Sequence, residues 1–174
     1  LSGNVPRKAY VNNGGDIAFH LSEGEIFEVL SPAGLLTITS QDSARGIATS
    51  GWQGRSHSLG IADAVSVVAK TAAAADVAAT LIANATNLPD HPAVGRCPAK
   101  QLSPDSDLGE RLVTTHVGYL STLDVDKALQ AGTRLASDYA ARGLVKTVAI
   151  SLQDQSHIIQ NSFPSNNTGV LAHA

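Results

Sequence analysis

One stretch of the sequence, residues 72–85, is rich in alanine, lacks glycine and proline, and carries a single charge, Asp76. Alanine is the best helix former, so this stretch predicts a helix, capped by Thr71 and ended by the prolines that begin at Pro89. A helix without a charged face is generally covered on all sides, where an uncompensated carboxylate is costly. We therefore expect Asp76 to be covered and to require a partner.

Asp76 and Thr80 are four positions apart, so they project from the same side of this helix. We expect the opposite side to be formed by Val77, Leu81, Ile82 and Ala85. Three kinds of partner would satisfy Asp76: an arginine such as Arg45 or Arg55, a ring of backbone N–H groups, or a hard divalent cation shared with the Thr80 hydroxyl. The residues alone favour the ion pair over the metal and leave all three open.

The rest of the sequence predicts an α+β fold. A second helix, with a charged outer face, is expected to begin at Thr122 or Asp124 and to end before Gly143. Residues 87–109 contain four prolines and are predicted to be irregular, and the tail from residue 161 is predicted to be loose. Apolar runs between turn residues predict strands at 8–11, 17–21, 25–30, 35–39, 47–50, 64–69, 112–120 and 145–152.

Composition and charge exclude several classes of protein. Charged residues make up 16% of the chain and hydrophobic residues 43%, which argues against disorder and coiled coils. The net charge of −3 gives no reason to bind nucleic acid or an anionic membrane. Cys97 is the single cysteine, which favours a reducing, cytoplasmic compartment. We expect one domain over residues 1–174; because the chain starts at Leu1 and has no methionine, we also expect that an N-terminal segment is missing.

Two glycine-rich polar segments are candidates for an anion-binding site. Residues 12–16, NNGGD, form either a nest of backbone N–H groups or a tight hairpin turn, with the turn slightly favoured. Residues 46–57, GIATSGWQGRSH, supply hydroxyl, backbone and arginine donors suited to a phosphate, although the Walker and GxGxxG patterns fail. His57 in this segment is a candidate general base, although a lone histidine in a polar loop is more often structural. The other histidines lack the spacing of zinc ligands.

Four segments together resemble an uncharacterised protein family related to ApbE, the flavin transferases that move FMN from FAD onto a protein threonine. They are NNGGDI (12–17), GIATSG (46–51), SVVAKTAAAADVAAT (66–80) and PDSDLG (104–109). The resemblance to the uncharacterised branch extends over nearly the whole chain. The link to ApbE itself rests on the GGD turn, the ATSG strand end and the A-D-x-x-A-T helix.

The resemblance implies that Asp76 and Thr80 ligate Mg²⁺ beside the diphosphate of FAD or a related flavin nucleotide. The resemblance therefore favours a metal ion over an arginine as the partner of Asp76. It also implies two related halves, each with helices packed on an antiparallel sheet in the manner of the tunnelling fold. The residues placed along the nucleotide cleft are Gly14, Gly15, Asp16, Thr49, Ser50 and Gly51, and Arg55 from the donor-rich loop completes the predicted set.

The sequence departs from ApbE in the His-x-x-Asp-Pro loop of those enzymes. His57 is retained, but Gly60 stands at the aspartate position and no proline follows. Two functions are therefore compatible with the sequence. The first is an Mg²⁺-dependent flavin transferase-like enzyme with a protein acceptor and His57 as proton acceptor; the second is a non-catalytic nucleotide-binding or structural protein on the same scaffold. A homo-oligomer is compatible with either.

Overall fold

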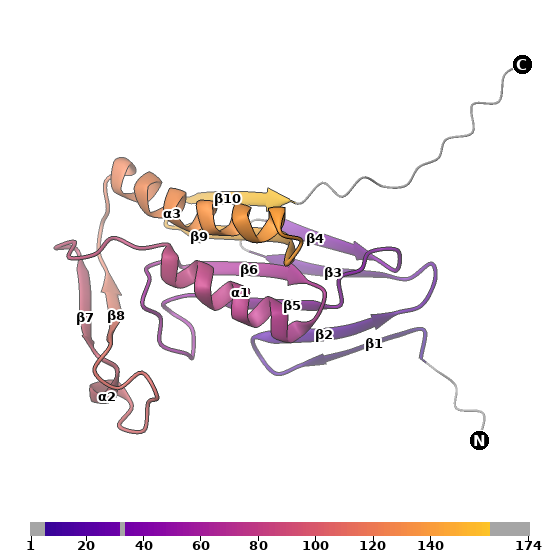
Figure 1. Cartoon of the computed structure of the whole chain (residues 1–174), viewed down its shortest axis with the longest axis horizontal. Helices are drawn as coiled ribbons and strands as arrows, with labels where there is room; N and C mark the ends of the chain where they lie inside the picture. Colours follow the sequence, from indigo (N-terminus) through magenta and orange to yellow (C-terminus); the bar gives the residue numbers. More distant parts are fainter. Residues whose placement is uncertain (1–5, 32–33, 161–174) are drawn as a thin grey trace, which may run out of the picture.

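The computed structural model describes residues 6–31 and 34–160 (Figure 1). These residues form a mixed α+β fold with three helices, α1 (Ala72–Ala85), α2 (Ala99–Leu102) and α3 (Thr122–Ala141). The strands are β1 (Lys8–Asn12), β2 (Asp16–Leu21), β3 (Ile26–Ser31), β4 (Gly34–Thr39), β5 (Gly46–Ser50), β6 (Ala64–Ala69), β7 (Val94–Pro98), β8 (Leu112–Val117), β9 (Val145–Leu152) and β10 (Gln155–Gln160).

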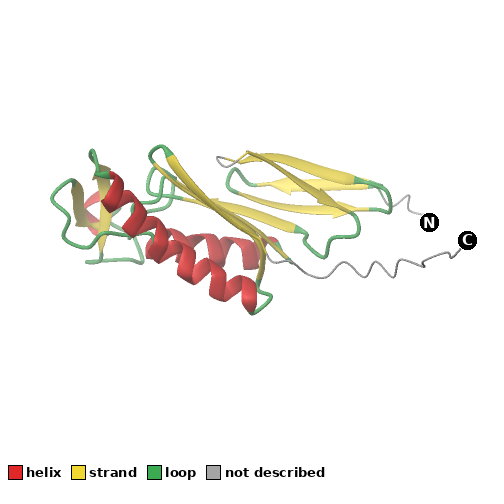
Figure 2. Cartoon of the chain, turned by 90° about the horizontal axis from the view of Figure 1, so that it is seen from above, coloured by secondary structure: helices red, strands yellow, loops and turns green. Residues whose placement is uncertain are grey.

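A six-stranded antiparallel sheet in the order β1-β2-β5-β6-β9-β10 forms the centre of the molecule. Strand β6 pairs with β5 on one side and with β9 on the other. Between β6 and β9 the chain passes through α1, the β7–β8 pair and α3. Helices α1 and α3 lie together on one face of the sheet, and β7, β8 and α2 extend beyond its end (Figures 1 and 2).

Two apolar clusters lie on the two faces of this sheet, because successive residues of a strand point to opposite sides. On β6, Val65 and Val67 join the cluster beneath α1 and α3, whereas Val68 joins the cluster beneath the β3–β4 hairpin. The rings of Phe19 and Phe27 stack at 4.6 Å between centroids in the second cluster. The hairpin is therefore held to the sheet by side-chain packing, since β3 and β4 form a separate two-stranded sheet.

Helix α1 buries four alanines and Ile82 and exposes its two other large apolar residues. The buried set is Ala75, Ala78, Ala79, Ile82 and Ala83, whereas Val77 is 58% exposed and Leu81 is 43% exposed. The expectation that α1 is covered on all sides, with Val77 and Leu81 inward, is therefore wrong. Strand β5 approaches the start of α1 closely: a Cβ on Gly46 would lie 2.0 Å from the Ala72 backbone nitrogen, which favours small side chains at that end, whereas the large Ile82 is buried near the other end.

Most of the predicted elements are confirmed, including the bounds of α1 and its cap, where Thr71 Oγ1 accepts from Ala74 N at 3.1 Å. Helix α3 begins at Thr122 with Ser121 as N-cap. Residues 87–109 are not wholly irregular, because they contain β7 and α2. Strand β8 ends at Val117 rather than at residue 120, and β10 was not predicted. The predicted loose tail from residue 161 lies outside the described residues.

Within the described ranges, no helix combines the length and the apolar character needed to cross a membrane.

Candidate functional site

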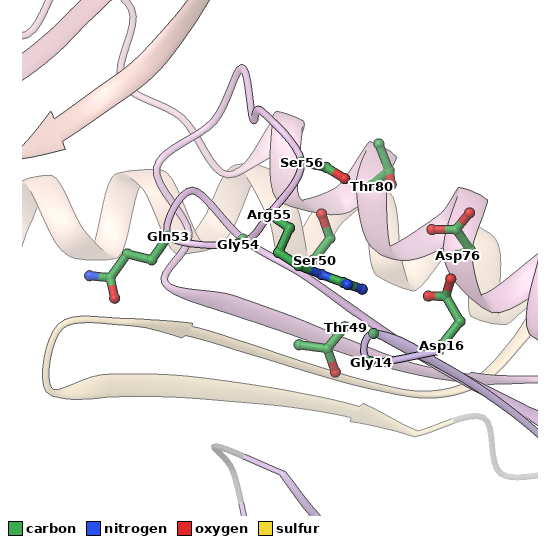
Figure 3. Close-up of a pocket in the computed structure, with 12 residues that line it drawn as sticks. Gly14, Asp16, Thr49, Ser50, Gln53, Gly54, Arg55, Ser56, Asp76 and Thr80 are labelled. Atoms are coloured by element: carbon green, nitrogen blue, oxygen red, sulfur yellow. The ribbon is translucent and has the colours of Figure 1, made fainter. Parts of the chain in front are cut away.

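A cavity of about 320 Å³ lies between the β1–β2 turn, the end of β5 with the loop that follows it, and α1 (Figure 3). It brings together all nine residues predicted to bind the cofactor or metal, from three separate segments of the sequence. The lining residues are Gly14, Gly15, Asp16, Thr49, Ser50, Gly51, Gln53, Gly54, Arg55, Ser56, Asp76 and Thr80.

Helix α1 places Asp76 and Thr80 on its exposed side, at one wall of the cavity. Among residues 6–31 and 34–160, none of the ion pairs includes Asp76. Arg45, one expected partner, donates instead to backbone carbonyls such as Ala44 O at 2.6 Å and Ser40 O at 2.9 Å. Arg55 donates to Asn13 O at 3.1 Å. The ion pair with either arginine is therefore not formed.

Asp16, from the start of β2, faces Asp76 across the cavity (Figure 3). Partial loss of solvent raises the pKa of Asp76, and the negative charge of Asp16 raises it further. The two neighbouring carboxylates produce a locally negative potential. A cation between them would relieve this repulsion, and hard divalent cations prefer such oxygen ligands.

The glycine turn is a hairpin turn and not an open nest. Asn12 Oδ1 accepts from Gly14 N at 2.7 Å, and Asn13 Oδ1 accepts from Gly15 N at 3.2 Å and from Asp16 N at 2.9 Å. These N–H groups are thus bonded within the turn. Gly14 has a φ of +92°, which favours glycine, and a Cβ there would lie 3.1 Å from Arg55 Nη2. The Arg55 guanidinium therefore lies against the turn and supplies the positive charge of this wall.

Thr49 and Ser50 differ in the direction of their hydroxyl groups. Thr49 Oγ1 lies 2.9 Å from Ser66 Oγ, on its cross-strand partner, and Figure 3 shows the side chain directed away from Asp76 and Thr80. Ser50, the next residue, points toward the side of α1. A ligand in the cavity would therefore meet the hydroxyl of Ser50 and only the backbone of Thr49.

His57 does not line the cavity. Its Nε2 lies 3.1 Å from Ser103 Oγ, at the end of α2. Nearby, a Cβ on Gly60 would lie 1.9 Å from Ala83 O, so the loop packs directly on α1. This close packing is a physical reason for glycine at residue 60.

Gln53, Gly54 and Ser56 also line the cavity, although they were not among the predicted site residues. Their signal in the sequence was their position beside Arg55 in the donor-rich loop. In the described part of the chain, no group of three or more His, Cys, Asp or Glu side chains is arranged to hold a metal ion. A metal here would need the Thr80 hydroxyl and oxygen atoms of the ligand to complete its coordination.

Comparison with known proteins gives a family match over most of the chain: residues 1–158 match the model described as AbpE bacteria. No curated protein and no solved structure matches the chain.

Proposed function

The chain belongs to the AbpE bacteria family, and we propose that it binds a flavin dinucleotide, FAD or a close relative, together with Mg²⁺ in the cavity between Gly14 and Asp76. The sequence resemblance to the ApbE-related family supports this ligand class. The same resemblance supports an arrangement in two tunnelling-fold-like halves, and the lone Cys97 supports a cytoplasmic setting.

The observation that carries the proposal is that the three motifs line one cavity, which has acidic groups on one wall and a basic group on another. Asp76, Thr80 and Asp16 supply hard oxygen atoms on one side, and Arg55 supplies a guanidinium on another. A diphosphate with its divalent cation matches this division. When bound, Mg²⁺ would neutralise the diphosphate and polarise the phosphoryl group. The Ser50 and Ser56 hydroxyls would orient the phosphate oxygens.

The finer proposal is transfer of FMN to a protein threonine. In that reaction the threonine hydroxyl oxygen forms a bond to the FMN phosphorus, the bond to the AMP oxygen breaks, and AMP leaves. The hydroxyl proton needs an acceptor, and His57 is the candidate that the sequence offers for this role. Because His57 bonds to Ser103 outside the cavity, nucleotide binding without transfer is the alternative function that this geometry favours.

Calorimetry with FAD, in the presence and absence of MgCl₂, tests the binding proposal. We expect binding to require Mg²⁺ and to weaken roughly tenfold or more in Asp76→Asn, because a charge-assisted contact contributes about 1.5–3 kcal/mol. Asp107→Asn is the matched control, since Asp107 is exposed and outside the cavity. The proposal would be contradicted if the wild type bound FAD equally well with and without Mg²⁺. It would also be contradicted if Asp76→Asn and Asp107→Asn bound FAD equally well.

Incubation with FAD, Mg²⁺ and a threonine-containing acceptor peptide separates transfer from binding alone. Mass spectrometry of the peptide detects a covalent FMN adduct. An adduct that disappears in Asp76→Asn supports the transferase. FAD binding without an adduct supports the non-catalytic alternative.

A further inference from the structure

A second cavity, of about 420 Å³, lies beyond the C-terminal end of α1 and is distinct from the cavity that contains Asp76. It is formed by the loop after β5, the segment that follows α1, and the two strands β7 and β8. Its charged lining residues are Arg96, Arg111 and Asp90, and its apolar ones are Leu59, Pro89 and Leu112.

Arg96 on β7 is held in place by neutral acceptors. Its Nη1 donates to Leu59 O at 2.7 Å and to Thr114 Oγ1 at 3.1 Å, and its Nη2 donates to Asn87 Oδ1 at 2.6 Å. These bonds use three of the five N–H donors of the guanidinium. None of the ion pairs in the described ranges includes Arg96. The guanidinium is thus fixed in position without a carboxylate in contact.

Because Arg96 is half-buried, its positive charge has a free-energy cost from partial loss of solvent. Burial lowers the pKa of Arg96, and the negative charge of Asp90 only partly opposes that effect. Arg111 adds a second positive charge to the same cavity. No hydrogen bond or ion pair holds the Arg111 side chain within residues 6–31 and 34–160. The lining therefore carries two positive charges against one negative charge, beside apolar side chains.

We propose that this cavity binds a small organic oxyanion, in which a carboxylate or phosphate group meets Arg96 and Arg111 and an apolar body packs on Leu59, Pro89 and Leu112. Planar guanidinium groups form paired hydrogen bonds with both kinds of oxyanion. An arginine already fixed by three neutral bonds would lose little freedom when it binds such a group. This site is additional to the nucleotide cavity and does not depend on it.

NMR titration of the full chain with benzoate, phenyl phosphate and the neutral benzamide tests the proposal. We expect benzoate or phenyl phosphate to cause saturable shifts of the Arg96 Nε–H signal and of the Leu59 and Asn87 signals. Benzamide should cause none of these shifts. Saturation by benzoate alone identifies a carboxylate site, and saturation by phenyl phosphate alone identifies a phosphate site. Equal shifts with benzamide, or no saturable shift with either anion, would overturn the proposal.

Two arginine variants make the test specific without disturbing the bonds of Arg96. Arg111→Gln should weaken binding of the anion about fivefold or more through loss of one charge-assisted contact. Arg134→Gln is the matched control, because Arg134 is exposed on α3 and outside this cavity; it should leave binding unchanged. If both variants lose the same affinity for the anion, the binding reflects the overall charge of the protein and not this cavity, and the proposal is overturned.

Discussion

At the scale of single residues, the protonation of Asp76 links the cavity to the stability of the protein. The folded state holds the proton of this carboxyl more tightly than the unfolded chain, because solvent is partly excluded and Asp16 lies opposite. As the pH rises through the ordinary value of 3.8 and then through the raised value, ionisation of Asp76 therefore weakens the folded state. The stabilising contribution of the protonated form is complete only at low pH.

Asp76→Asn should raise the melting temperature at neutral pH, because it removes this charge from the cavity. The gain should shrink as the pH falls through the raised pKa of Asp76 toward 3.8, and it should be absent well below 3.8, where the side chain is neutral in both states. Thermal unfolding followed by circular dichroism between about pH 3 and pH 8 measures this dependence.

Asp107→Asn serves as the control for this prediction, since the Asp107 carboxylate is exposed and lies outside the cavity. Added MgCl₂ should raise the melting temperature of the wild type more than that of Asp76→Asn, because a ligand of the folded state stabilises it. A melting temperature for Asp76→Asn equal to the wild type at neutral pH would contradict the electrostatic account.

At the scale of elements, α1 and α3 meet at a contact that only glycine permits. A Cβ on Gly132 of α3 would lie 2.1 Å from Thr86 Oγ1, at the end of α1, and Thr86 is fully buried. Thr86 Oγ1 also donates to Ile82 O at 3.0 Å, which fixes its position. The close approach of the two helices therefore depends on the absence of a side chain at residue 132.

Gly132→Ala should destabilise the protein by about 2 kcal/mol, although alanine is about 1 kcal/mol better than glycine in an isolated helix. The steric cost exceeds the gain because the contacted atom is buried and hydrogen-bonded. Urea unfolding measures the change in the free energy of unfolding. Combining Gly132→Ala with Thr86→Ala should destabilise the protein less than the sum of the single variants. Ser137→Ala, on the exposed side of α3, is the control. If the destabilisations caused by Gly132→Ala and Thr86→Ala simply add in the double variant, the contact between the two residues is not tight.

The elements most fully predicted from the sequence are those whose signal is local. Thr71 and the alanine run predict the start and the course of α1, and Pro89 predicts that the helix ends before it. The GGD and ATSG segments predict two walls of the cavity. The buried face of α1 was not predictable, because it depends on how closely β5 approaches at Gly46. Strand β10 was missed because its residues, QSHIIQ, are mostly polar and form a strand through pairing with β9. The direction of His57 depends on tertiary packing near Gly60.

At the scale of the whole molecule, two apolar clusters on opposite faces of one sheet indicate two units of different stability. The cluster beneath α1 and α3 is the larger, and the cluster beneath the β3–β4 hairpin depends on few side chains. Phe27 is central to the second cluster, since it stacks on Phe19 and lies edge-on to Tyr10 at 5.9 Å. The hairpin lacks backbone pairing to the six-stranded sheet. It is therefore expected to open before the rest of the fold.

Phe27→Ala should lower the opening free energy of the β3 and β4 amides by roughly 3 kcal/mol, through loss of buried aromatic packing. The amides of β6 and β9 should lose much less protection. Native-state hydrogen exchange measures both sets at once. Leu30→Ala is the control, because Leu30 lies on the same hairpin but is 80% exposed. An equal loss of protection across all strands would show that hairpin and sheet unfold as one unit.

The turn between β1 and β2 satisfies its own backbone N–H groups through the Asn12 and Asn13 amide oxygens. Its shape is therefore set before any ligand arrives, and association incurs no entropy cost for ordering this segment. The cost falls on the exposed side chains of Arg55 and Asp76, whose interactions are screened by dissolved salt. Affinity in this cavity should consequently fall as the ionic strength of the solution rises.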